Sequence, residues 1–287
     1  MFDVCIIGHI TQDIVITRNI ERKMAGGTAY YSSIALKRLG ANICVVTKTA
    51  EGDKGLLDDL IGNSITIFYR ESQETTTFKN IYPKEPNFRI QEIRSIAQSF
   101  KPRDIPNIST HFFHLGPLTK KDLSMEILKL LSKKAKISLD VQGFVRKIDK
   151  GQVKGSDWEE KEEGLTYINI LKASESEAKI LSGENNLKKT AIKLSTYGID
   201  EVIITCGRSG SLIYSKGKFY PIAYFLPRKI VDTTGCGDTY IAAYIHKRLK
   251  SKNINEAGRF AAATAALKAE SFGPFKEDEE SVQKFLN

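Results

Sequence analysis

The sequence lacks several features that would place it in a familiar class of protein. No apolar run approaches the roughly 18 residues that a membrane-spanning helix needs. The four cysteines form no CxxC pair and are not spaced for a zinc site. No basic leader precedes the first apolar run, which argues against a secretory signal. We therefore expect a cytoplasmic protein with reduced thiols and no membrane partner.

Internal repeats, low-complexity segments and a linker rich in proline, glycine or serine are also missing. We therefore expect one domain over residues 1–287, with a core supported by 41% hydrophobic residues. The net charge of +9 is spread along the chain, whereas nucleic-acid binding favours a clustered basic face. We expect no nucleic-acid partner. A solvated basic surface is the simplest interpretation, and attraction of a small anionic ligand is the functional alternative.

What is present is an alternation of short apolar runs and helical patterns. Buried strands are expected at residues 4–8, 42–49, 109–116, 136–141, 167–172 and 201–207. Helices are expected at residues 29–39, 123–134, 174–181, 187–197, 237–250 and 255–269. This order predicts a doubly wound α/β fold with a mainly parallel sheet flanked by helices. Two β-rich regions, residues 10–23 and 64–99, predict a small antiparallel sheet that acts as a lid.

The stretch VDTTGCGDTY, residues 231–240, places glycines at the start of a helix. The backbone N–H groups of Gly235, Cys236 and Gly237 would lack intrahelical partners there and could bind an oxyanion. No Gly-Lys-Ser/Thr follows, and a tyrosine stands where a dinucleotide motif has its third glycine. Asp238 is either an acid favoured by the helix dipole or a general base for a hydroxyl that attacks a bound phosphoryl group.

Two further glycine stretches adjoin expected elements. Gly26 and Gly27 come directly before a predicted helix, where a structural turn is as good an interpretation as a ligand site. Thr205, Gly207 and Gly210 follow a predicted parallel strand, where nucleotides often bind. Each stretch alone is a weak signal.

Taken in order, the three stretches resemble the ribokinase-like, or PfkB, family of carbohydrate kinases. DTTGCGDTY is similar to the family's second signature, Asp-Thr-x-Gly-Ala-Gly-Asp. GHITQDIV carries Gly8 and Asp13, and EGDKG (residues 51–55) resembles the family's Gly-Asp turn. The resemblance covers nearly the whole chain. It implies a phosphotransferase that moves the γ-phosphate of ATP to a hydroxyl of a small sugar or polyol, with Mg²⁺ and, in many members, a monovalent cation such as K⁺.

The resemblance also implies a role for each matched residue. The catalytic set is Asp238 as the base, with the amides of Gly235, Cys236 and Gly237 as an anion hole. The acceptor-binding set is Asp13, Gly26, Gly27, Tyr31 and Gln142. The ATP-binding set is Thr205, Gly207, Gly210, Arg146 and Gly273. The metal set is Glu177 for Mg²⁺, through water, and Asp232 and Thr234 for the monovalent cation.

Several residues depart from the family's pattern. The Asn-x-x-Glu motif linked to magnesium appears as Ser174–Glu177; serine can still hydrogen-bond a magnesium-bound water, so the motif is weakened but not abolished. Cys236 replaces an alanine. A thiol at a helix N-terminus tends to have a lowered pKa, although a small residue that simply fits is the plainer interpretation. Residues 28–31 replace the Lys-Gly-Ala-Asn of ribokinases, which makes ribose a poor first hypothesis.

GGTAYY and LDVQGFVR (residues 139–146) look similar to the myo-inositol kinase branch, so a myo-inositol-like acceptor is the first hypothesis. LDVQGFVR also resembles a stretch whose polar residues reach the ATP phosphates in other members. One alternative is a nucleoside kinase of the same fold, in which lid aromatics stack on a base; the candidates are Phe68, Tyr69, Phe78 and Phe88. Another is a non-catalytic nucleotide- or polyol-binding sensor, supported by the altered Asn-x-x-Glu motif. A homodimer through the lid is expected from some relatives.

Overall fold

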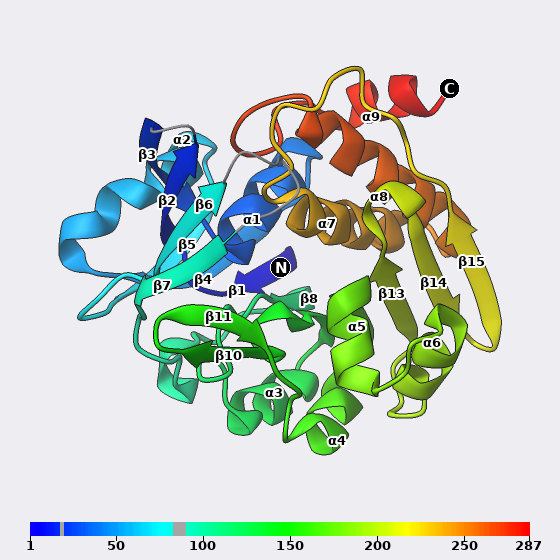
Figure 1. The fold of residues 1–287 in the computed structure, drawn as a ribbon, viewed down its shortest axis with the longest axis horizontal. Helices are drawn as coiled ribbons and strands as arrows, with labels where there is room; N and C mark the ends of the chain where they lie inside the picture. The colour runs from blue at the N-terminus through cyan, green and yellow to red at the C-terminus, as the bar shows by residue number, and fades with distance from the viewer. Residues whose placement is uncertain (18–19, 83–89) are drawn as a thin grey trace.

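Two β-sheets of different size organise the chain (Figure 1). The computed structural model describes residues 1–17, 20–82 and 90–287. The large sheet has nine strands in the order β15-β14-β13-β12-β9-β8-β1-β4-β5. The second sheet has six, in the order β10-β11-β7-β6-β2-β3.

The large sheet is parallel from β5 to β13 and antiparallel at β14 and β15. Its strands are β1 (Phe2–Ile7), β4 (Ile43–Thr49), β5 (Thr66–Glu71), β8 (Thr110–Leu115), β9 (Lys136–Asp140), β12 (Ile170–Ser174), β13 (Glu201–Thr205), β14 (Ser211–Ser215) and β15 (Lys218–Ile222). The chain adds strands outward from β1 on one side, then returns to add β8 on the other. This order confirms the expected doubly wound architecture.

Helices cover both faces of this sheet. They are α1 (Thr28–Arg38), α2 (Asp58–Gly62), α3 (Met125–Ser132), α4 (Lys161–Gly164), α5 (Glu175–Ser182), α6 (Leu187–Ser195), α7 (Cys236–Lys250), α8 (Ile254–Ala269) and α9 (Glu279–Leu286). Short 3₁₀ turns occupy Glu51–Leu57, Pro102–Asp104, Val141–Gly143, Leu165–Tyr167 and Gly207–Ser209. In the part of the chain that the structure describes, no helix combines the length and apolarity needed to cross a membrane.

Strand β1 shows why the large sheet has a layer of helices on each face. Val4 and Ile6 pack in a core that includes residues of α1, α7 and α8, whereas Cys5 and Ile7 pack in a second core with residues of α3, α5 and α6. Successive side chains of a strand point to opposite faces, so a continuous apolar run needs a helical layer on each side. The run VCII therefore sits at the centre of the fold.

The second sheet is mostly antiparallel, with one parallel pair between β2 and β6. Its strands are β2 (Thr11–Thr17), β3 (Ile20–Gly26), β6 (Thr77–Tyr82), β7 (Ile90–Ser95), β10 (Arg146–Asp149) and β11 (Gln152–Gly155). Two details differ from the expected lid of residues 10–23 and 64–99. Strand β5 pairs with β4 in the large sheet, and the β10–β11 hairpin joins the second sheet. Within those ranges, residues 18–19 and 83–89 lie outside the described residues.

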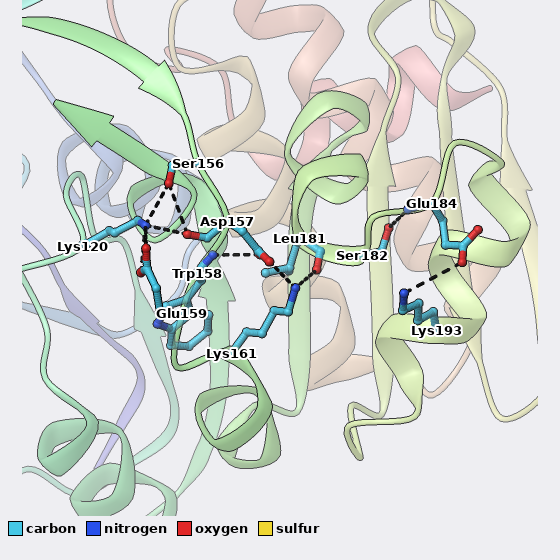
Figure 2. A network of polar contacts seen from close by, with 10 residues as sticks. All are labelled: Lys120, Ser156, Asp157, Trp158, Glu159, Lys161, Leu181, Ser182, Glu184 and Lys193. Carbon is cyan, nitrogen blue, oxygen red and sulfur yellow. Dashed lines mark hydrogen bonds and ion pairs between the residues drawn. The ribbon is translucent and has the colours of Figure 1, made fainter. Parts of the chain in front are cut away.

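Figure 2 shows how the segment after β11 is tied to the main body. The Lys120 Nζ atom donates to the Glu159 carboxylate at 2.8 Å. The Lys161 Nζ atom donates to the main-chain carbonyl of Leu181, near the end of α5, at 2.8 Å. These bonds connect three separate stretches of chain, so the chain re-enters the main body after the β10–β11 hairpin at an anchored point.

Candidate active site

Polar residues gather where the parallel strands of the large sheet end. Strand β9 ends at Asp140, β12 carries Lys172 near its end, and β13 ends at Thr205. The segment after β1 leads to Asp13 on β2. Because β1 and β8 flank the point at which the strand order reverses, this edge is the expected ligand site of an open α/β sheet.

The start of α7, which we call the anion cradle, has the backbone geometry expected of an anion site. Gly235 adopts the left-handed conformation at φ 77°, and a Cβ atom there would overlap the ring of Tyr31. The Cys236 amide donates to the Thr233 carbonyl at 3.2 Å, so it is the least available of the three predicted donors. Within the described residues, the amides of Gly235, Gly237 and Asp238 have no such acceptor. This first turn therefore offers donors to an anion.

Asp238 lies in this first turn and is partly buried. Burial raises the pKa of its carboxyl, and the neighbouring Asp140 carboxylate raises it further. The positive charges of Lys172 and Arg146 oppose this rise, and the resulting pKa is about 6. A carboxyl group with that pKa is mostly ionised at neutral pH and is well suited to accept a proton.

Lys172 is a functional candidate that the sequence did not single out. Its side chain is buried, and its Nζ atom donates to Asp140 Oδ2 at 2.8 Å. A Cβ atom on Gly237 would lie 3.0 Å from that Nζ, so the ammonium group faces the start of α7. Burial alone would lower the pKa of Lys172, but the charges of Asp140, Glu177 and Asp238 outweigh it and raise the pKa above its ordinary value. A fixed positive charge therefore lies beside the anion cradle.

Asp13 and the two early glycines form a second part of the site. Asp13 is buried, and its Oδ1 atom accepts a hydrogen bond from the Thr11 hydroxyl at 2.7 Å. A Cβ atom on Gly26 would lie 2.6 Å from Asp13 Oδ2. Gly27 is the N-cap residue of α1 at φ 90°, and a Cβ atom there would lie 2.6 Å from the His9 carbonyl oxygen. Glycine is therefore required at both positions for the backbone to approach this closely.

Tyr31 links the two parts. Its ring packs against Gly235, and its buried hydroxyl has no hydrogen-bond partner among the described atoms. Burial raises the pKa of this hydroxyl, and the charges of Asp13, Asp232 and Asp238 raise it further. The phenol therefore stays protonated. Buried hydroxyls without a partner are rare, so this one is a candidate donor to a ligand.

A cavity of about 1060 Å³ leads away from the start of α7. Its lining includes Thr234, Cys236 and Gly237 from the start of α7, and Thr205, Gly207 and Gly210 from the end of β13 and the turn after it. The apolar part of its wall includes Tyr224, Phe225, Ile230, Ala262, Ala265 and Ala269. A cleft that combines an apolar lining with a few polar and backbone groups has the character of a ligand site.

The turn after β9 brings Gln142 and Arg146 to the site by a different route. Asp140 Oδ1 accepts the Gln142 amide at 3.2 Å, and the Gln142 residue is partly exposed. The Arg146 guanidinium lies 5.8 Å from the ring centroid of Phe78 on β6, and its charge acts on Asp238. Arg146, the first residue of β10, therefore presents its charge to Asp238 from the second sheet, and it is not among the residues that line the large cavity.

The Ser174–Glu177 motif forms the start of α5. The Glu177 amide donates to Ser174 Oγ at 3.3 Å, and Glu177 Oε2 accepts the Ser174 amide at 2.8 Å. This reciprocal pair is a capping box, which gives the serine a structural role. Residues 1–17, 20–82 and 90–287 contain no group of three or more side chains that could hold a metal. A Mg²⁺ ion at Glu177 would therefore take most of its ligands from phosphate and water, as this ion commonly does.

The carboxylate of Asp232 is engaged on both oxygens. Its Oδ1 accepts the Thr234 amide at 2.9 Å, and its Oδ2 accepts the Gly273 amide at 3.3 Å. Lys268 Nζ donates to the same Oδ2 at 3.1 Å and to the Asp232 main-chain carbonyl at 2.9 Å. A lysine therefore stands at the residue where the sequence led us to expect a monovalent cation. Gly273, expected at the ATP site, lies beside Asp232.

The thiol of Cys236 differs from the usual behaviour of cysteines at helix N-termini. Burial raises its pKa to about 11, although the charge of Lys268 acts in the opposite direction. Its Sγ atom donates to the Ala265 carbonyl at 3.5 Å. A thiol with a raised pKa is mostly protonated at neutral pH, which agrees with the interpretation of Cys236 as a small residue that simply fits.

The aromatic residues expected to stack on a nucleoside base are dispersed. Phe68 and Tyr69 lie on β5 in the large sheet, where the Tyr69 hydroxyl donates to the Thr49 carbonyl at 3.0 Å. Phe78 is buried beneath Arg146. Phe88 lies outside the described residues.

Comparisons with known proteins agree with this arrangement. Residues 1–279 match the profile described as pfkB family carbohydrate kinase. A cytidine kinase from Thermococcus kodakarensis is 26% identical over 271 residues, which cover 90% of this chain and 93% of that protein. A pyrophosphate-dependent kinase of the ribokinase family, solved with a pyrophosphate analogue and myo-inositol, has a TM-score of 0.88 and 27% identity over 98% of this chain and 99% of its own. Arabidopsis thaliana ribokinase with ribose and ATP has a TM-score of 0.80 and 20% identity over 100% and 99% of the two chains, which shows the shared fold.

Proposed function

Because the chain belongs to the PfkB family of carbohydrate kinases, we propose that it transfers the γ-phosphate of ATP to a hydroxyl group of a small polyol or sugar. The observation that carries this proposal is the Asp238 carboxyl group, with a pKa of about 6, in the first turn of α7. It lies next to unpaired amides and near the Lys172 ammonium group. A base and an anion site this close together suit phosphoryl transfer to a hydroxyl.

Each residue has a defined step in this reaction. Asp238 takes the proton of the acceptor hydroxyl, whose oxygen forms a bond to the γ-phosphorus. The bond from that phosphorus to the bridging oxygen breaks, and ADP keeps the electron pair. The amide of Gly237 and the Lys172 ammonium stabilise the negative charge of the phosphoryl oxygens. Mg²⁺, held by the phosphates and by Glu177 through water, would supply neutralising charge.

The large cavity favours ATP over pyrophosphate as the donor. Its apolar wall of tyrosine, phenylalanine and alanine side chains suits a base and a ribose, whereas pyrophosphate has no apolar part to bury there. The similarity to a pyrophosphate-dependent kinase makes pyrophosphate the donor to compare with ATP.

A polyol acceptor is supported by what lies around Asp13. Asp13 and the Tyr31 hydroxyl are polar groups suited to a substrate with several hydroxyls. The similar kinase solved with myo-inositol makes that compound the first to test. The similarity to a cytidine kinase keeps nucleosides as the second candidate, although Phe68, Tyr69 and Phe78 are not arranged to stack on a base.

The second sheet is proposed to act as the lid of this site. Val15 on β2 and Met24 on β3 line the large cavity. The Arg22 guanidinium on β3 lies 5.5 Å from the ring centroid of Phe272, which also lines this cavity. A sheet that spans the cleft in this way would exclude water and so limit hydrolysis of ATP.

A panel of donors and acceptors tests these assignments together. ATP and pyrophosphate are each combined with myo-inositol, fructose, ribose, adenosine and cytidine, and the phosphorylated product is identified by phosphorus NMR and mass spectrometry. We expect turnover with ATP and a polyol or sugar. Turnover with pyrophosphate but not with ATP would overturn the assignment of ATP as the donor. Turnover with nucleosides but with no polyol or sugar would overturn the assignment of the acceptor. ATP binding without any product would favour the non-catalytic sensor.

A further inference from the structure

Lys268 is a buried cation to which the proposed phosphoryl transfer assigns no direct role. Its side chain is 0% exposed, although it belongs to a helix near the surface cavity. Its Nζ atom donates to the main-chain carbonyl oxygen of Asp232 at 2.9 Å and to the Asp232 carboxylate at 3.1 Å. Burying an ammonium group is costly unless it is paired, so these oxygens fix its position.

The same ammonium group lies against the structure that forms the anion cradle. It is 5.8 Å from the ring centroid of Tyr31, and that ring packs against Gly235. Its charge also opposes the rise in pKa that burial causes at the Cys236 thiol, so its field reaches the first residue of α7. Lys268 therefore both holds the loop that leads into the cradle and adds positive potential there.

A main-chain carbonyl and a carboxylate oxygen from one residue are ligands that a hard cation prefers. An ammonium group carries the same charge as K⁺, has a similar size and binds the same oxygens. The expected cation at Asp232 and Thr234 would have to share Oδ2 and the carbonyl with a lysine that already occupies both. The residues present therefore do not fit a monovalent cation at this position.

From this disagreement we infer that Lys268 takes the place of the monovalent cation, and that the protein works without K⁺. The inference rests on the proposed kinase function for its catalytic consequence. The structural claim, that the lysine fills the cation position, stands independently and has its own readout.

The unmodified protein gives the first test. Initial rates and the melting temperature are measured in KCl, NH₄Cl, NaCl and choline chloride at equal ionic strength. We expect the rates to agree within about twofold and the melting temperature to be the same in KCl and choline chloride, because the position is already filled. Activation by K⁺ of about tenfold or more over both Na⁺ and choline would overturn the inference.

Substitution of the lysine gives the second test. Lys268→Ala opens space beside Asp232, so a dissolved cation should be able to replace the lost charge. We expect its rate to fall by about tenfold or more in choline chloride, and K⁺ or NH₄⁺ to restore much of the rate and to raise the melting temperature. Lys276→Ala, at an exposed lysine, is the matched control and should show neither effect.

Each remaining outcome decides the question. A folded Lys268→Ala protein that keeps its full rate in choline chloride would overturn the inference, and so would one that K⁺ and NH₄⁺ neither reactivate nor stabilise. If the Lys268→Ala variant does not fold, the salt series on the unmodified protein still tests whether the protein works without K⁺. If no acceptor is phosphorylated at all, the proposed function fails, while the effect of K⁺ on the two melting temperatures still tests the role of Lys268.

Discussion

Replacing Lys172 by methionine removes the positive charge beside the anion cradle while keeping a side chain of similar length. Its partner Asp140 has a side chain only 1% exposed, so the variant leaves a buried carboxylate without its ion pair. Breaking such a pair costs about 3–5 kcal/mol. That is a large share of the roughly 5–15 kcal/mol by which a typical domain is stable, so we expect a clear fall in melting temperature.

The catalytic effect has two components. The charge of Lys172 lowers the pKa of Asp238, so its loss should raise that pKa above the present value of about 6. Asp238 works as a base only when ionised, so kcat/KM should fall about tenfold for each pH unit below its pKa and be level above it. The acid limb of the profile therefore moves to higher pH. Loss of a charged hydrogen bond to phosphate, worth about 1.5–3 kcal/mol, should also lower the plateau value of kcat/KM by about 10- to 100-fold.

The double variant Lys172→Met/Asp140→Asn separates these components. Asp140 raises the pKa of Asp238 and Lys172 lowers it, so removing both should return the acid limb towards about 6. The plateau value of kcat/KM should stay low in the double variant because no ammonium group faces the phosphate. The assay is kcat/KM for the best acceptor from about pH 5 to about pH 9, with melting temperatures as the control. An unchanged acid limb and level rate in Lys172→Met would refute the role of this lysine.

Other substitutions test separate parts of the site. Gly26→Ala would place a Cβ atom 2.6 Å from Asp13 Oδ2. KM for the acceptor should therefore rise by about tenfold or more, while KM for ATP stays the same. Equal increases in both KM values would contradict this role of Gly26. Tyr31→Phe removes the unpartnered hydroxyl and should raise the acceptor KM several-fold at an unchanged melting temperature, whereas identical kinetics would exclude a contact. The Cys236 thiol has a pKa raised to about 11, so iodoacetamide at neutral pH should leave the rate unchanged, and loss of activity that Cys236→Ala prevents would show a reactive thiol.

Much of the fold was predictable because its signals are local. The run VCII of β1 is apolar at every position, which requires cover on both faces, and the structure provides a core on each side. The glycines at residues 235 and 27 adopt positive φ angles at helix starts, as their sequence context indicates. These features depend on a few consecutive residues, so the sequence alone defines them.

The sheet to which a short strand belongs depends on tertiary contacts. Strand β5 is an edge strand in which every residue is intermediate or exposed, and its β-branched and aromatic side chains suit either sheet. Its parallel pairing with β4 places β5 in the large sheet, and no local sequence pattern encodes that pairing. The β10–β11 hairpin was missed for a similar reason, because its strands have four residues each and partly exposed side chains.

The two buried lysines of the site, Lys172 and Lys268, also depend on contacts between residues that are far apart in the sequence. Lys172 is a charged residue inside the short strand ILKAS, a signal that could have identified it, but its partner Asp140 is 32 positions away. Lys268 lies near the end of an alanine-rich helix, and Asp232 is 36 positions away. A lysine in a helix or strand is usually solvated, so the folded arrangement was needed to pair each of these two with its aspartate.

The most direct test of the central claim is the turnover of Asp238→Asn with ATP and the best acceptor at about pH 7.5. The amide keeps the shape of the side chain but cannot take the hydroxyl proton, so we expect kcat to fall by about two to four orders of magnitude. ATP binding, measured by calorimetry, should be retained, and Asp58→Asn, at an exposed aspartate, should keep the full rate. A kcat for Asp238→Asn within about threefold of the unmodified protein would contradict the assignment of Asp238 as the catalytic base.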